Sequence, residues 1–216
     1  MSKRVLVVSA GGHGQVVADI LQAMHAHEGV VIPIGFVDDD PALEAHVCMG
    51  LPIFGPVSSV RNIDHDTIIV AIGDNSRRRI VTESLVGAGE QLTTVIHPRA
   101  IVAPSSFIGA GAMICAAAVV GPASVIGIGT ILNTSCSVDH HNKIGDFAHI
   151  GPGARLGGEV TIGAGSLLGI GSVVLPRLRI GARSTVAGGA VVTRDVDDET
   201  TVIGVPAIPY ARRVRT

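Results

Sequence analysis

The chain has 216 residues, 16 of them basic and 18 acidic, and its net charge of −2 and scarcity of aromatic rings argue against a nucleic-acid partner. With 28 glycines, no tryptophan and 47% hydrophobic residues, its core must consist of Val, Ile, Leu and Ala, which favours many small, similar layers. The three cysteines form no CxxC pair and no apolar run reaches about 18 residues, so we expect a soluble, cytoplasmic protein without a disulfide framework, a zinc knuckle or a membrane span.

Strand and helix patterns alternate over residues 1–95. Short β-branched runs predict strands at 3–8, 30–37, 67–72 and about 92–96, and apolar residues at helical spacing predict a helix near 16–24. A basic helix is expected at about 75–86. This order predicts a domain with a small parallel sheet of Rossmann-like type. Its first strand ends at the glycine turn Gly11-Gly12-His13-Gly14, and its second ends at Asp38.

From Ile96 onward the period becomes six. The first position of each unit is aliphatic seventeen times in succession up to Val192, nine of the second positions between Gly109 and Gly181 are glycine, and the fifth position is nearly always small. Each unit predicts a short strand and a tight turn, in which glycine is expected to accept unusual backbone angles. Three units would close one triangular coil, so we predict a parallel β-helix domain over 96–216 that includes a C-terminal tail. A β-sandwich would need more variable strand lengths.

One stretch of the repeat is discordant. Asp139-His140-His141-Asn142-Lys143 places polar residues where the other units have glycine and small residues, and His149 follows at an outward position. His140 and His141 fall in a turn, so they should project from an edge of the prism. An imidazole, with an ordinary pKa of about 6.5, can take a proton from an amine or hydroxyl near neutral pH, as acyl transfer requires. The alternative is that both are solvated turn residues.

These residues resemble the hexapeptide-repeat acyltransferases, whose β-helix is left-handed. The run from Asn133-Thr134 through Asp139-His140-His141 to His149-Ile150 is similar to the motif of sugar O- and N-acetyltransferases, which include the sialic acid O-acetyltransferase and the bacillosamine or perosamine N-acetyltransferase types. The resemblance implies transfer of an acetyl group from acetyl-CoA to an amino group or hydroxyl of a nucleotide-linked sugar. It also implies that residues 1–95 bind the nucleotide sugar and that the protein is a homotrimer.

The resemblance further implies that His140 is the general base. In that family an acidic residue follows the base and is thought to orient it, whereas this chain has His141 there. His141, Asp139 and Asp146 are therefore the three candidates for the orienting group. No Cys or Ser lies beside His140 as an evident nucleophile, which favours direct transfer without a covalent intermediate.

Binding residues are also implied by the resemblance. Acetyl-CoA is expected at His149, Gly158, Ile170 and Gly188, where glycines let backbone amides approach it. The diphosphate of the sugar nucleotide is expected at Gly12, His13 and Gly14, at the start of a helix. Asp38 would meet the base or ribose, and Gly73 and Asn75 would line the same crevice at the carboxyl ends of the strands. Ordinary repeat and turn chemistry is the alternative at these positions.

The leading hypothesis is N-acetylation of a nucleotide-linked amino sugar without a metal, and O-acetylation is the nearest alternative. A zinc lyase of the γ-carbonic anhydrase type also uses a β-helix, and His140, His141 and His149 would be its ligands. A non-catalytic nucleotide-sugar sensor is a further option. The run Arg77-Arg78-Arg79 is typical of a solvated helix face and receives no role.

Overall fold

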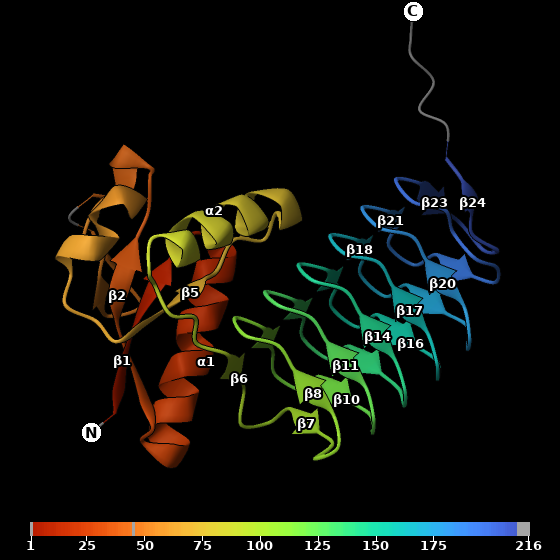
Figure 1. Ribbon diagram of the computed structural model, residues 1–216, viewed down its shortest axis with the longest axis horizontal. Coiled ribbons are helices and arrows are strands. Elements are labelled where there is room, and N and C mark those ends of the chain that lie inside the picture. Colours follow the sequence, from red (N-terminus) through yellow and green to blue (C-terminus); the bar gives the residue numbers. More distant parts are fainter. Residues whose placement is uncertain (1, 45, 211–216) are drawn as a thin grey trace, which may run out of the picture.

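The computed structural model describes residues 2–44 and 46–210 and shows an α/β domain followed by a long β-helix (Figure 1). The predicted C-terminal tail beyond residue 210 lies outside the described residues. Three parallel strands form the sheet of the first domain in the order β2-β1-β5, with bounds β1 (Lys3–Val8), β2 (Val31–Val37) and β5 (Thr67–Val70). Their Val- and Ile-rich runs are largely buried, because helices or loops cover both faces of a parallel sheet.

Two helices flank this sheet. Helix α1 (Gly12–Glu28) begins directly after Gly11, and α2 (Asn75–Gly87) begins after Asp74, whose carboxylate accepts a hydrogen bond from the backbone N–H of Arg77. The short elements between β2 and β5 are η1 (Pro41–Leu43), β3 (Val47–Cys48), β4 (Leu51–Pro52) and η2 (Val57–Asn62). Within residues 2–44 and 46–210, no helix combines the length and apolarity needed to cross a membrane.

The expected strand at 92–96 divides between the two domains. Leu92 forms a single parallel bridge with Ile68 of β5, whereas β6 (Val95–Ile96) pairs with the second coil of the β-helix. Buried residues of α1 and of the β-helix then share one core, in which Val17 and Leu21 pack with Met113 and Ile131. The first domain is therefore anchored on one side of the prism.

The β-helix has three faces built mostly from two-residue parallel strands, each paired with the strand eighteen residues later. The first face contains β7 (Ile101–Val102), β10 (Val119–Val120), β13 (Ser137–Val138), β16 (Arg155–Leu156), β19 (Val173–Val174) and β22 (Val191–Val192). The second contains β8 (Phe107–Ile108), β11 (Val125–Ile126), β14 (Lys143–Ile144), β17 (Thr161–Ile162) and β20 (Arg179–Ile180). The third contains β6, β9 (Met113–Ile114), β12 (Ile131–Leu132), β15 (His149–Ile150), β18 (Leu167–Leu168), β21 (Thr185–Val186), β23 (Thr201–Ile203) and β24 (Ile208–Pro209). At the end of the third face, β21 pairs with the three-residue β23 at a spacing of sixteen, and β23 pairs with β24 in antiparallel fashion. The third face carries the first domain.

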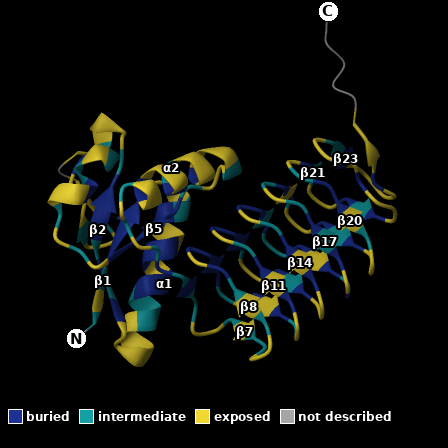
Figure 2. Cartoon of the chain, viewed as in Figure 1, coloured by how far each residue is buried: buried dark blue, intermediate teal, exposed yellow. Residues whose placement is uncertain are grey.

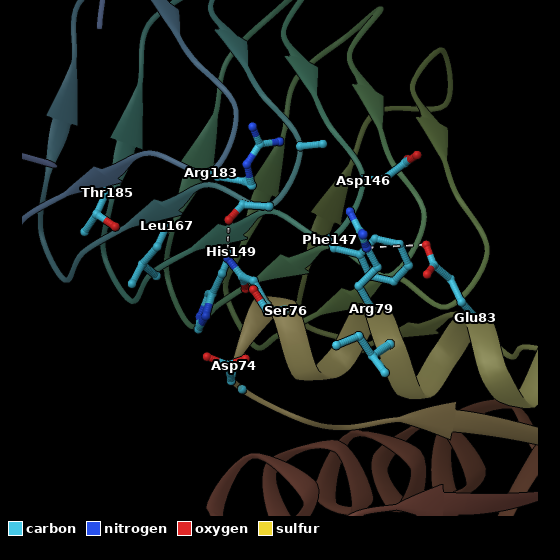
Figure 3. A pocket seen from close by; sticks show the side chains of 15 residues that line it. Asp74, Ser76, Arg79, Glu83, Asp146, Phe147, His149, Leu167, Arg183 and Thr185 are labelled. Carbon is cyan, nitrogen blue, oxygen red and sulfur yellow. Dashed lines mark hydrogen bonds and ion pairs between the residues drawn. The ribbon is translucent and has the colours of Figure 1, made fainter. Parts of the chain in front are cut away.

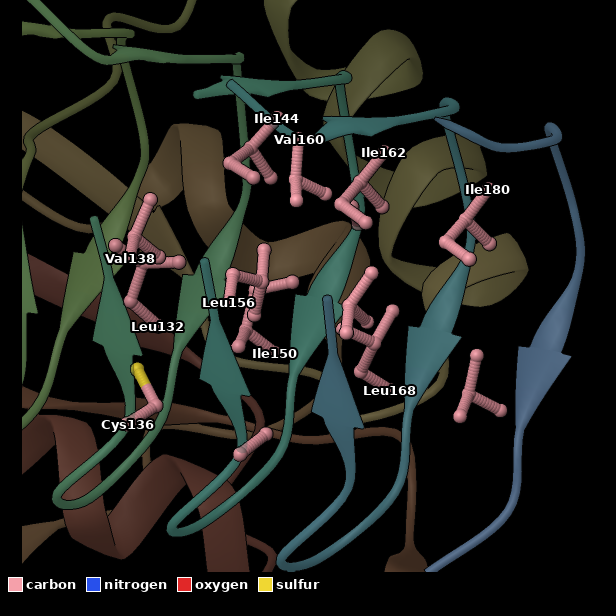
Figure 4. Close-up of a cluster of buried hydrophobic side chains, with 14 of the residues drawn as sticks. Leu132, Cys136, Val138, Ile144, Ile150, Leu156, Val160, Ile162, Leu168 and Ile180 are labelled. Atoms are coloured by element: carbon pink, nitrogen blue, oxygen red, sulfur yellow. The ribbon is translucent and has the colours of Figure 1, made fainter. Parts of the chain in front are cut away.

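The first position of each hexapeptide points into the prism, as predicted. Inward aliphatics such as Val138, Ile144 and Ile162 stack in a continuous buried column, which Figure 4 shows from within. In Figure 2 the β-helix strands combine dark blue buried residues with yellow or teal outward ones. This column confirms the predicted fold class of an α/β domain followed by a parallel β-helix. At the fifth position, Ser166 donates a hydrogen bond from its hydroxyl to the backbone carbonyl of Gly181, so small polar residues join adjacent coils.

The reason for the second-position glycines differs from the expectation. None of the nine has a positive φ; the left-handed residue lies at the fourth position, as in His141 (φ 57°) and Gly165 (φ 69°). A Cβ on Gly109 would instead lie 2.7 Å from the backbone carbon of Gly127 in the next coil. These glycines are thus required by the close approach of stacked coils.

Candidate active site

His140 and His141 lie in the turn between β13 and β14, at the corner where the first and second faces meet. Both side chains are exposed, as predicted, and their Nδ1 atoms lie 3.1 Å apart with the rings nearly perpendicular, at 82°. Their separation is that of a hydrogen bond, in which one imidazole donates and the other accepts. We call residues 139–142, together with the turns stacked on them, the His140 corner.

The backbone of this turn is held from inside the prism by Asn142. Its buried side-chain amide donates to the backbone carbonyls of Asp139 (2.6 Å) and Gly157 (3.0 Å), and its Oδ1 accepts from the N–H of Val160 (3.1 Å). The Ser124 hydroxyl donates to the same Asp139 carbonyl at 2.7 Å. Sequence reasoning did not single out Asn142, although an Asn at a fifth position otherwise filled by Ala, Ser or Thr was a usable signal.

Gly158, predicted to contact acetyl-CoA, lies directly against the ring of His140. A Cβ at position 158 would stand 2.4 Å from both Cε1 and Nε2 of that imidazole. The ring therefore occupies the space that a side chain at 158 would take. The absence of a side chain at Gly158 therefore leaves room for the His140 ring in this position.

His149 lies on the third face, under the first domain, together with His13. The two ring centroids are 6.3 Å apart, and the side-chain amide of Asn133 lies 3.0 Å from Nε2 of His149. Burial lowers the pKa of His149 to about 4, helped by the positive charge of Arg78 and opposed by the Gly73 carbonyl. Burial likewise lowers the pKa of His13 to about 4, with further lowering by His149 and Arg78. Both imidazoles are neutral at pH 7.

Arg78 was expected to be solvated, but its side chain is completely buried. Its guanidinium donates to the backbone carbonyls of Ile72 (2.8 Å), Gly129 (2.8 Å) and Phe147 (2.8 Å), and to Oδ1 of Asn75 (2.8 Å). It thereby ties the end of β5 and the start of α2 to two turns of the β-helix. Burial lowers its pKa to about 10, against the opposing effect of Asp74, so it remains charged at pH 7.

The residues predicted to bind the nucleotide sugar cluster at the carboxyl ends of the sheet strands, as expected. A Cβ at Gly14 would stand only 2.0 Å from the carbonyl oxygen of Ser9, so this glycine is required by packing. Gly12 and Gly73 are exposed, and Asp38 closes the first turn by accepting from the N–H of Ala10 at 2.8 Å. The Asn75 amide donates to the carbonyl of Gly165 at 3.0 Å, so it joins the two domains.

A cleft of about 910 Å³ opens where α2 meets the β-helix. In Figure 3, Ser76 and Arg79 of α2 lie on one side of this cleft, and His149 and Leu167 of the third face lie on the other. Gly73 and Asn75 also line it. One open cleft therefore adjoins three of the predicted site residues, all of them around the third face.

The predicted residues thus fall into three groups within one chain. His140, His141 and Gly158 share one corner, and His13, Gly73, Asn75 and His149 lie at the third face. Ile170, which is 69% exposed, and Gly188 stack on the corner between the third and first faces.

The three proposed zinc ligands do not converge, because His149 lies on the face opposite the corner of His140 and His141. No group of three His, Cys, Asp or Glu suited to a metal occurs within the described parts of the chain. The zinc-lyase alternative is therefore not supported within a single chain.

Comparison with known proteins agrees with this architecture. Residues 4–85 match the family model of the PglD N-terminal domain. UDP-N-acetylbacillosamine N-acetyltransferase of Bacillus subtilis (strain 168) is 34% identical over 114 residues, a match that spans 50% of the chain and only 50% of that relative.

Solved structures match over nearly the whole length. The acetyltransferase domain of PglB from Neisseria gonorrhoeae FA1090, in complex with acetyl coenzyme A, is 37% identical with a TM-score of 0.90, covering 97% of this chain and all of that one. PerB from Caulobacter crescentus, in complex with CoA and GDP-perosamine, is 35% identical with a TM-score of 0.88, covering 96% and 97%. The chain therefore belongs to the family of sugar N-acetyltransferases that join a PglD-type N-terminal domain to a hexapeptide-repeat β-helix.

Proposed function

We propose that the protein transfers the acetyl group of acetyl-CoA to the amino group of a nucleotide-linked amino sugar, with His140 as general base. The observation that carries the proposal is the His140 corner. An imidazole stands exposed there on a turn that Asn142 holds from inside the prism, with Gly158 against its ring. The solved relatives that bind acetyl-CoA, or CoA with GDP-perosamine, share this fold over nearly their full length.

In the proposed reaction the amino nitrogen attacks the thioester carbonyl carbon while His140 removes the proton from that nitrogen. The C–S bond then breaks and CoA leaves as the thiolate. Cys136 takes no part as a nucleophile, because it is buried in the prism core and burial raises the pKa of its thiol to about 12.

We infer that the active site is shared between two copies of the chain. In a triangular prism the His140 corner lies opposite the third face, where His13, Gly73 and the cleft are found. A sugar nucleotide held at the third face therefore cannot present its amino group to His140 of the same chain. In the proposed homotrimer, His140 of one subunit would act on a sugar nucleotide held by the first domain of its neighbour.

The direct test incubates the purified protein with acetyl-CoA and a panel of UDP-, GDP- and CMP-linked amino sugars. We expect release of free CoA thiol and a product that has gained one acetyl group on nitrogen for at least one of them. His140→Ala should lower the turnover rate by at least roughly a hundredfold while CoA affinity is kept. Acetylation of the hydroxyl analogues alone would favour the O-acetyltransferase, and activity of His140→Ala equal to the original protein across pH 6 to 9 would exclude His140 as the base.

A further inference from the structure

The structure separates the three candidates for the group that orients His140. The Asp139 carboxylate accepts a hydrogen bond from the backbone N–H of His140 at 2.8 Å, so it serves the turn and not the ring. Asp146 lies at a different corner, where its Oδ1 accepts from the N–H of Ile128 at 2.8 Å. Among the residues that the structure describes, only the His141 ring hydrogen-bonds to the His140 imidazole.

Two tautomer arrangements satisfy the contact between the two Nδ1 atoms. If His141 donates, His140 carries its remaining proton on Nε2 and has no free lone pair for a substrate. If His140 donates, its Nε2 lone pair is free and His141 becomes the acceptor. Only the second arrangement leaves a base at His140.

Building on the proposed function, we propose that His140 and His141 form a two-imidazole proton relay in which His141 accepts the Nδ1 proton of His140 and passes it to solvent. As the amine nitrogen bonds to the thioester carbon, its proton moves to Nε2 of His140. The Nδ1 proton of His140 moves to Nδ1 of His141, which becomes the imidazolium. The exposed His141 then loses its Nε2 proton to water, and the departing CoA thiolate takes a proton from solvent. After the products leave, His140 releases its Nε2 proton to water and takes back the Nδ1 proton from His141, and His141 regains a proton on Nε2 from water, which restores the starting tautomers.

The surroundings of the pair favour a route to solvent. The turn stacked on one side, Gly121 to Ser124, contains no titratable side chain, and the backbone N–H of His141 donates to Pro122 there. On the other side, Glu159 and Arg177 occupy successive turns, with the Arg177 guanidinium 4.0 Å from the Glu159 carboxylate. Asp139 and the exposed Lys143 are the charged residues next to the pair along the chain. In the single chain His141 is itself exposed, so water reaches its ring.

A substrate-independent experiment tests the hydrogen bond. Two-bond ¹H–¹⁵N NMR spectra of histidine-labelled protein at pH 8 distinguish the two neutral tautomers. We expect the Nδ1–H tautomer for His140 and the Nε2–H tautomer for His141 in the original protein. In His141→Ala, His140 should lose its preference for Nδ1–H, whereas Lys143→Ala, on the same corner, should leave it unchanged. An Nε2–H tautomer for His140 in the original protein would overturn the relay.

Kinetics test the proton transfer itself. His141→Ala should lower the acetyl-transfer rate by at least about tenfold, a part of what general base catalysis contributes, without weakening CoA binding. The rate should also be measured in mixtures of H₂O and D₂O and plotted against the fraction of D₂O. This plot should be curved for the original protein, since two protons move, and straight for His141→Ala. His141→Glu should retain activity, with the acid limb of its pH profile moved to higher pH, because a carboxylate beside an imidazole favours the protonated ring.

The outcomes separate the relay from the function on which it rests. A straight plot of rate against the fraction of D₂O for the original protein would overturn the relay but not acetyl transfer. An unchanged rate in His141→Ala would have the same consequence. Absence of transfer to every amino sugar tested would overturn the proposed function, and the NMR tautomers would still decide whether His141 is the acceptor.

Discussion

At the scale of single residues, the His140 ring occupies the space that a side chain at position 158 would take. In Gly158→Ala the new Cβ would lie 2.4 Å from Cε1 and Nε2 of the ring, so the imidazole must move. We expect the turnover rate to fall by roughly tenfold or more, because small misplacements of a catalytic group are costly. The melting temperature should change little, since the displaced ring is exposed.

The matched control is Gly87→Ala. Gly87 is the last residue of α2, and a Cβ there meets no atom within 4 Å in the described structure. This change should leave the rate unaltered. Equal rates for Gly158→Ala and the original protein would show that catalysis does not depend on the ring position that Gly158 allows.

The buried pair His13 and His149 makes stability dependent on pH. Each has a pKa of about 4 in the folded protein and about 6.5 when unfolded, so the unfolded chain binds more protons between these values. Stability should therefore be intact above pH 6.5 and fall as the pH drops to 4, by roughly 3 kcal/mol per histidine.

Chemical denaturation at a series of pH values measures this loss. In the double variant His13→Gln and His149→Gln, the decline between pH 6.5 and 4 should be smaller, since neither side chain titrates. His27→Gln, on the exposed end of α1, serves as the control and should show the original slope. A slope that the double variant does not reduce would place the sensitivity elsewhere.

At the scale of elements, Arg78 joins α2 to the β-helix. Arg78→Lys keeps the charge but cannot reach the carbonyls of Ile72, Gly129 and Phe147 together, because those bonds use the planar fork of the guanidinium. A buried carbonyl left without a donor costs about 1–3 kcal/mol, so we expect a loss of roughly 2–4 kcal/mol in the free energy of unfolding.

The neighbours of Arg78 provide the comparison. Arg77 and Arg79 are exposed and make ion pairs with Asp39 (3.8 Å) and Glu83 (3.4 Å). Arg77→Lys and Arg79→Lys should each change stability by less than about 1 kcal/mol, as expected for surface pairs. The unfolding of all variants should be measured at the same protein concentration, because assembly shifts apparent stability. Equal losses in the free energy of unfolding for all three variants would show that the buried Arg78 stabilises the protein no more than its exposed neighbours do.

The sequence pattern predicts the β-helix well because one local rule repeats. Each first-position aliphatic packs on the residue eighteen positions later, so the register follows from the period alone. The burial of Arg78 follows from no local rule, since its partners lie at 129 and 147, in a different domain. The chain shows three adjacent arginines, and only the packing of α2 against the prism distinguishes the middle one.

The candidate site was predictable in its residues but not in its arrangement. His140 and His141 stood out because they break the repeat, and their exposure at a corner follows from their position in the hexapeptide. Whether the His140 ring lies against Gly158 depends on the orientation of the ring. Whether Asn142 reaches its hydrogen-bond partners depends on the distance between stacked turns. Both are tertiary properties. The orienting role of His141 likewise required knowing that Asp139 and Asp146 are engaged elsewhere.

At the scale of the whole molecule, the prism places the His140 corner and the site residues of the third face on opposite sides. The outward surface also carries exposed apolar side chains, among them Phe107 (64% exposed) and Ile170 (69%). Light scattering of the purified protein should give the mass of a trimer. An active monomer would contradict a site shared between subunits.

Mixed trimers provide the decisive test of the shared site. His140→Ala subunits lack the base and His13→Ala subunits are altered at the sugar-nucleotide turn, so neither should be active alone. If each site takes His140 from one chain and His13 from its neighbour, random mixing of equal amounts restores about one quarter of the sites. Activity near that fraction, with subunit exchange verified by mass spectrometry of tagged chains, is the expected result. No recovery despite verified exchange would mean that each site is built within one chain, against the geometry of the prism, in which the His140 corner and the third face lie opposite each other.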